Sequence, residues 1–323
     1  MLTRRDVLLG AAGLAAIAPF RLTASAEQAA AESAPAPVLI PPGATDCHTH
    51  VFCDAKAFPF AEGRTYTPGP ALVDEMQALH RVLHMERVVV VQPSVYGTDN
   101  RCTLEALQLL GPRARGIAVI GDGTPEEELD RMDRAGIRGI RVNLETAGQS
   151  DPAIGRQHFE AAMRRVARRP WHIQIFTRLS VIAAMADALA SAPVPVVFDH
   201  FGGAQGAAGV EQPGFDALLT LVRSGRAYVK ISAPYRGSTR PPDYPDMAPL
   251  AKALIAANPR RILWGSDWPH PNTSPAAPRT EAGTAPRVSV DDAHVLNLLA
   301  GWVPDPDLRR TILVDNPAAL YRF

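Results

Sequence analysis

The stretch GATDCHTHVF, residues 43–52, decides the fold. Its apolar and β-branched residues predict a strand. Side chains two residues apart on a strand share a face, so His48 and His50 are expected to point the same way, with Cys47 on the opposite face. Two imidazoles placed like this form one edge of a polar site.

Similar runs recur along the chain, with helical patterns between them. The eight expected strands cover residues 44–50, 87–92, 116–120, 137–142, 172–176, 195–199, 228–232 and 261–265. Apolar spacing of three and four predicts helices over 70–84, 103–110, 125–135, 156–168, 180–190, 215–223 and 247–257. Strands alternating with helices predict a parallel sheet, and eight such units predict an α/β fold of one domain, a closed (β/α)8 TIM barrel over residues 44–323. No GxGxxG follows the first strand, so a dinucleotide-binding fold has no support.

The N-terminal residues are expected to lie outside this barrel. Arg4-Arg5, an apolar run over 7–20 and the small residues Ala24-Ser25-Ala26 predict a twin-arginine (Tat) signal peptide over residues 1–26. The Tat machinery would then export the folded protein to the periplasm; an uncleaved anchor is the less favoured alternative, because the run is short for a bilayer. Residues 27–43, rich in Ala, Pro and Ser, are expected to be a flexible linker.

Charge and cysteine content narrow the function classes. The chain has 33 basic and 33 acidic residues, and zero net charge argues against a nucleic-acid partner or a membrane-surface role after signal cleavage. Its 3 cysteines are too few for a disulfide framework. All three are expected to be packing residues, with a Cys53–Cys102 bridge as the alternative in an oxidising compartment.

In a barrel of this kind the chemistry lies at the C-terminal ends of the strands. His48 and His50, His200, and Asp267 follow the first, sixth and eighth expected strands, and are expected to line one mouth. Imidazole and carboxylate groups are zinc ligands, so a metal on His48, His50 and Asp267 is one use of the set. Trp264 and Trp268 should desolvate Asp267, raise its pKa and suit it to act as a general base. The histidines on helical stretches are expected at the surface; these are His80, His84, His158 and His294.

These motifs, in this order, resemble the amidohydrolase superfamily, and within it the "amidohydrolase 2" branch with its 2-pyrone-4,6-dicarboxylate hydrolases and sugar lactonases. The resemblance rests on DCHTH (46–50), DH (199–200) and WGSDWPHP (264–271), supported by RGIRVN (138–143) and VKIS (229–232). It implies a lactone hydrolase in which Asp267 activates water and His48, His50 and His200 polarise the carbonyl. It also implies that a single zinc ion is possible, although this lactonase group can work without metal, which is the favoured expectation.

The resemblance further implies that arginines and hydroxyl groups bind the carboxylates of a small lactone or carboxylate substrate. The candidates are Arg141, Arg236, Tyr66, Ser94 and Tyr96. The chain departs from the family pattern at two positions. Glu145 stands where a basic side chain is expected, and Phe176 stands where a tyrosine is expected. Both changes favour a substrate with fewer anionic groups, such as a sugar-acid lactone. A zinc-dependent decarboxylase or hydratase of the same branch, and a non-catalytic periplasmic binding protein, are the alternatives. Residues 271–287, rich in Pro, Ala, Thr and Ser, are either a flap over the site or a disordered excursion.

Overall fold

The computed structural model describes residues 38–273 and 284–323. The predicted signal peptide and residues 27–37 of the predicted linker lie outside the described residues. The end of that linker is not free: the backbone N of Val38 donates to Asn297 Oδ1 at 2.9 Å, and Ile40 packs against the core. Residues 38–43 are therefore held against the barrel.

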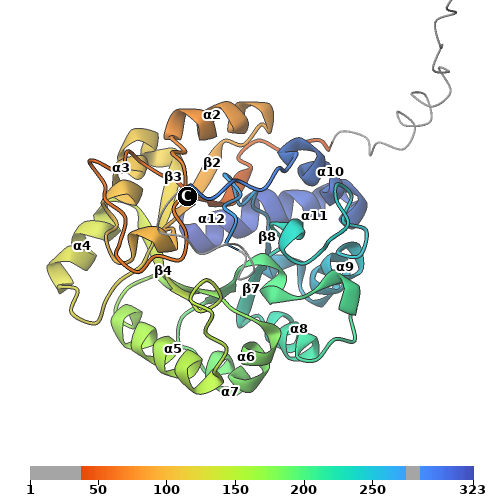
Figure 1. Ribbon diagram of the computed structural model, residues 1–323. Coiled ribbons are helices and arrows are strands. Elements are labelled where there is room, and N and C mark those ends of the chain that lie inside the picture. Colours follow the sequence, from red (N-terminus) through yellow and green to blue (C-terminus); the bar gives the residue numbers. More distant parts are fainter. Residues whose placement is uncertain (1–37, 274–283) are drawn as a thin grey trace, which may run out of the picture. The chain divides into compact units, whose positions relative to one another are not determined.

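Eight parallel strands follow one another in chain order around the centre of the molecule, and helices surround them (Figure 1). They are β1 (Thr45–Thr49), β2 (Arg87–Val91), β3 (Ala114–Ala118), β4 (Ile137–Asn143), β5 (His172–Phe176), β6 (Val196–Phe198), β7 (Ala227–Lys230) and β8 (Ile262–Leu263). The ring closes where the backbone N of Cys47 donates to the carbonyl O of Trp264 at 3.0 Å and Thr49 bridges Trp268. The predicted (β/α)8 barrel is confirmed.

The helices lie between and after the strands. They are α2 (Val73–Val82), α3 (Arg101–Leu110), α4 (Glu126–Arg134), α5 (Pro152–Val166), α6 (Leu179–Ala184), α7 (Ala186–Ala190), α8 (Phe215–Arg223), α9 (Ala248–Ala257), α10 (Asp292–Trp302), α11 (Pro306–Arg310) and α12 (Asn316–Tyr321). The helix expected over 180–190 is divided into α6 and α7, and α10 to α12 had not been predicted. None of the helices described is long and apolar enough to cross a membrane.

Two apolar layers share the strands. Alternate residues such as Val88 and Val90 of β2 pack outward against the helices, while Val89 and Val91 face the barrel interior with Cys47. The pairing of β1 with β2 shifts register between Asp46 and Thr49. Such a bulge lets the neighbours Cys47 and His48 both face inward, so the expectation that Cys47 points away from the histidines is wrong.

Two further expectations are corrected. Cys53 and Cys102 form a disulfide that joins the loop after β1 to α3, so only Cys47 is a free packing cysteine among the described residues. His80 is not a surface residue: it is 2% exposed, and its Nε2 lies 3.2 Å from Asp46 Oδ2. The Asp46 carboxylate also accepts the hydroxyl of Ser266 at 2.6 Å, and it thereby ties β1 and α2 to the segment after β8.

Candidate active site

The four residues expected to carry the chemistry meet at one point in the barrel mouth. Oδ1 of Asp267 lies 3.5 Å from Nε2 of His48 and 3.5 Å from Nε2 of His50. Nε2 of His200 lies 3.7 Å from the same oxygen. All four side chains are buried, so a small molecule reaching this point would leave bulk water behind.

The local backbone explains this convergence. A Cβ on Gly265 would lie 2.8 Å from both the backbone N and the Cβ of His48, so glycine is required where β8 approaches β1. His200 and Asp267 have φ values of +46° and +65°, a region that non-glycine residues seldom adopt. Strained backbone of this kind gathers at functional sites, and here it turns both side chains toward the β1 histidines.

The second oxygen of Asp267 is fully engaged. Oδ2 accepts a hydrogen bond from the Tyr235 hydroxyl at 2.5 Å and another from Arg236 Nε at 2.8 Å. Oδ1, in contrast, has no hydrogen-bond partner among the described residues, and neither does Nε2 of His48. The site therefore presents one carboxylate oxygen, ringed by imidazoles, to whatever enters.

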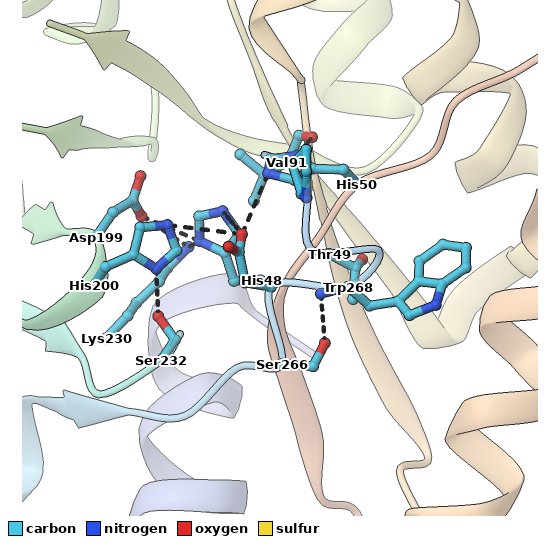
Figure 2. Close-up of polar contacts among 12 residues, drawn as sticks. His48, Thr49, His50, Val91, Asp199, His200, Lys230, Ser232, Ser266 and Trp268 are labelled. Atoms are coloured by element: carbon cyan, nitrogen blue, oxygen red, sulfur yellow. Dashed lines mark hydrogen bonds and ion pairs between the residues drawn. The ribbon is translucent and has the colours of Figure 1, made fainter. Parts of the chain in front are cut away.

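The other ring nitrogen of each histidine has a different partner. Nδ1 of His50 lies 2.8 Å from the carbonyl O of Val91, and Nδ1 of His200 lies 2.9 Å from Ser232 Oγ. Nδ1 of His48 lies 3.2 Å from Lys230 Nζ (Figure 2). Because a carbonyl oxygen only accepts hydrogen bonds, His50 carries a proton on Nδ1, and the neutral form of the ring has its lone pair on Nε2.

A buried charge network lies beneath His48, and sequence reasoning had missed its centre. Lys230, which is 0% exposed, donates from Nζ to Gln174 Oε1 at 2.7 Å and lies 3.5 Å from Asp199 Oδ1. Arg141 donates to Asp199 Oδ2 from Nε at 3.1 Å and from Nη2 at 3.0 Å. The only signal in the sequence was a lysine inside an otherwise apolar strand.

The electrostatics overturn the expectation that the Asp267 carboxyl has a raised pKa. Burial raises the pKa of Asp267, but the charge of Arg236 and the imidazoles of His200, His50 and His48 outweigh burial and hold it well below its usual range. Burial lowers the pKa of His200 to about 3. Asp267 is therefore ionised and His200 neutral across the physiological range.

The candidate substrate residues divide into two groups. Tyr66 is buried, is hydrogen-bonded to the Ser94 side chain and lies within the field of Arg141 and Arg236. Burial raises its pKa to about 12, so it remains a neutral donor. The hydroxyl of Tyr96, in contrast, accepts a hydrogen bond from the backbone N of Cys53 at 3.0 Å, which fixes the loop after β1.

A cavity of about 640 Å³ opens beside His200 and Arg236. Phe176 forms part of its wall and meets the His200 ring edge-on at 5.1 Å. At its rim Arg178 donates to Glu145 from Nε at 2.7 Å and from Nη2 at 2.9 Å. Arg178, which follows β5, is thus paired with Glu145, the acidic residue found after β4 where a basic side chain was expected.

The stems of segment 271–287 reach the site, although residues 274–283 lie outside the described part of the chain. Arg236 donates to Thr273 Oγ1 at 2.8 Å and to the carbonyl O of Pro271 at 3.2 Å. On the other stem, Ala285 N donates to the carbonyl O of Thr67 at 2.7 Å. Both stems therefore lie at the barrel mouth.

A metal ion can be tested against the donor set. The ligand atoms of His48, His200 and Asp267 lie within 4.8 Å of one another, and this grouping differs from the expected set by containing His200 in place of His50. Imidazole nitrogens and a carboxylate are the right chemistry for zinc. The fit depends on the proton of His48, because Nε2 is the atom that would have to coordinate, and Nδ1 of the same ring lies 3.2 Å from Lys230 Nζ.

Comparisons with known proteins show the family of the chain. The family model described as "Amidohydrolase" matches residues 45–323. A 4-sulfomuconolactone hydrolase of Rhizobium radiobacter is 36% identical, covering 90% of this chain and 94% of its own length. A 2-pyrone-4,6-dicarboxylate hydrolase of Comamonas testosteroni is 32% identical, covering 87% and 91%. The crystal structure of a probable 2-pyrone-4,6-dicarboxylic acid hydrolase from Acinetobacter baumannii, with citric acid bound, superposes with a TM-score of 0.73 at 26% identity, covering 87% of this chain and 100% of that one.

Proposed function

The chain belongs to the amidohydrolase family, and we propose that it hydrolyses a lactone that carries an anionic group, without a metal. The observation that carries the proposal is the single unengaged oxygen of Asp267 facing three imidazoles in a buried mouth. The relatives named above act on a sulfonated lactone and on a pyrone dicarboxylate, which are cyclic esters with anionic substituents.

In the proposed reaction, Asp267 and His50 hold the attacking water. Oδ1 of Asp267 and the lone pair on His50 Nε2 are both acceptors, 3.5 Å apart, so one water molecule can donate a hydrogen bond to each. Asp267 removes a proton as the water oxygen bonds to the lactone carbonyl carbon. The ring C–O bond then breaks, and the leaving oxygen takes the proton held by Asp267. The product is a hydroxy acid, or an enol acid where the ring oxygen was bound to a vinylic carbon.

In the proposed reaction, His48 and His200 bind and polarise the lactone carbonyl oxygen. A lactone carbonyl oxygen placed next to Nε2 of His48 and His200 would develop negative charge in the transition state, and N–H donors already in position stabilise it. Tyr66, Ser94 and Arg141 lie nearby and would bind the anionic substituent; the planar fork of arginine matches a carboxylate or sulfonate. The Glu145–Arg178 pair at the cavity rim favours a substrate with one anionic group, such as a sugar-acid lactone, over a dianion.

Asp267→Asn tests the role of Asp267. The variant keeps the shape of the side chain but cannot take the proton, so kcat on the best substrate from a lactone panel should fall by about 10³-fold or more, while the circular dichroism spectrum shows an intact fold. Hydrolysis is followed with a pH indicator, with and without chelator. Near-normal turnover by the variant would end the assignment of Asp267, and loss of wild-type turnover on chelation would contradict metal independence.

We also propose that the protein is exported to the periplasm. The twin-arginine pattern motivates the proposal, and the Cys53–Cys102 disulfide supports it, because such bonds persist in oxidising compartments. In fractionated bacteria, the full chain should appear in the periplasm and the Arg4→Lys/Arg5→Lys variant in the cytoplasm. If the wild-type chain and the variant divided equally between periplasm and cytoplasm, export by this route would be contradicted.

A further inference from the structure

We propose that Lys230 is a positioning residue that fixes the proton of His48 on Nε2, so that His48 enters the reaction as a hydrogen-bond donor and not as a metal ligand. The inference rests on the proposed function for its catalytic consequence. Its structural part, the position of one proton, stands independently.

Two groups compete for Nδ1 of His48. Lys230 Nζ lies 3.2 Å from this nitrogen in hydrogen-bonding geometry, and Asp199 Oδ1 also lies at 3.2 Å. If His48 carried its proton on Nδ1, that proton would have to point at Asp199. The Asp199 contact lies outside the geometry of a linear hydrogen bond from Nδ1 in the described residues.

The contacts of Lys230 show that it is the donor. Its Nζ also donates to Gln174 Oε1 at 2.7 Å. Asp199 Oδ1, at 3.5 Å, supplies the counter-charge for an ammonium group (Figure 2). An ammonium nitrogen has no lone pair, so Nδ1 of His48 must be the acceptor. A neutral imidazole with a lone pair on Nδ1 carries its hydrogen on Nε2.

The consequence is a division of labour between the two histidines of β1. His50 donates from Nδ1 to the carbonyl O of Val91 and presents a lone pair to the mouth. His48 accepts at Nδ1 and presents an N–H. The HxH pair of β1 thus supplies one acceptor for the water and one donor for the carbonyl oxygen, and the contacts behind each ring make the difference.

The decisive measurement is the tautomer of His48 in the wild-type protein. Long-range ¹H–¹⁵N spectra of the imidazole rings separate the two neutral tautomers; the signals of His48 are assigned by their loss in His48→Gln, and those of the exposed His84 serve as an internal reference. We expect a proton on Nε2 of His48 and on Nδ1 of His50. A proton on Nδ1 of wild-type His48 would overturn the inference, whether or not the protein hydrolyses lactones.

Lys230→Met supplies the second test. It removes the donor, so Nδ1 of His48 should become protonated toward Asp199, and kcat should fall by about a hundredfold with KM changed much less. The freed lone pair on Nε2 should raise zinc affinity, measured by equilibrium dialysis, by roughly tenfold. Retention of the Nε2 proton in Lys230→Met would show that Lys230 does not set it. If this variant does not fold, the wild-type spectrum still decides.

Discussion

At the scale of single residues, the site depends on how the two oxygens of Asp267 are used. Tyr235 and Arg236 occupy Oδ2, and Oδ1 remains for chemistry. Hydrogen bonds to a carboxylate favour its charged form and lower its pKa. Asp267 is consequently a weak base that is ionised across the physiological range, and its reactivity depends on position and on the exclusion of water rather than on a raised pKa.

Tyr235→Phe tests this arrangement. Loss of the 2.5 Å hydrogen bond removes a donor to the charged form, so the pKa of Asp267 should rise and the acid limb of the kcat/KM profile should move to higher pH. Tyr228→Phe is the matched control, because Tyr228 lies in β7, the strand that precedes Tyr235, and its hydroxyl contacts Arg261 instead. A profile that stays in place in Tyr235→Phe would show that the Tyr235 bond does not tune Asp267.

The sequence predicted the convergence of His48, His50, His200 and Asp267 because each follows a strand, and strand ends share one rim of a barrel. It did not predict Lys230 or Tyr235 as partners of these residues. Such contacts depend on strand stagger and on the side-chain reach of β7 toward β1 and β8, which spacing does not encode. For the same reason the shift in the pKa of Asp267 was predicted with the wrong sign: the tryptophans are its neighbours in sequence, whereas Arg236 lies in the turn after β7.

At the scale of elements, the spacing of apolar residues predicted seven of the helical regions, and apolar, β-branched runs predicted all eight strands. Local irregularities were not visible in the pattern. The bulge in β1 reverses the expected side of Cys47, and β8 is only two residues long. Helices α10 to α12 follow the last strand, where an eightfold alternation gives no reason to expect more elements.

The Cys53–Cys102 disulfide is an element-scale constraint, because it joins the loop after β1 to α3 across 49 residues. Restricting the unfolded chain by a loop of this length is worth about 4 kcal/mol in the chain-entropy model. Reduction of the wild-type protein should therefore lower its free energy of unfolding, measured in urea, by a comparable amount, and the midpoint should fall with it. The Cys53→Ala/Cys102→Ala variant should show the lower midpoint with or without reductant, and a wild-type midpoint that ignores reductant would contradict a stabilising role.

At the scale of the whole molecule, the barrel keeps several histidines buried and neutral. Burial lowers the pKa of His172 and His200 to about 3 and holds that of His48 well below its usual range. In the unfolded chain each would titrate near 6.5. Between these values the unfolded state binds protons that the folded state does not, so stability is complete above about pH 6.5 and is lost as pH falls.

The expected result is a free energy of unfolding that declines from pH 7 toward pH 4, by up to about 1.4 kcal/mol per pH unit for each such histidine. Below about pH 4 the low pKa values of Asp199 and Asp267 add to the loss, because these carboxylates must also take up protons. Urea unfolding at a series of pH values measures the slope. His172 packs against Tyr321 and lies outside the catalytic group. The His172→Gln variant should lose the contribution of one proton to the slope of the free energy of unfolding against pH. If the slope were unchanged in that variant, acid loss of stability would have to come from general charge repulsion rather than from buried neutral histidines.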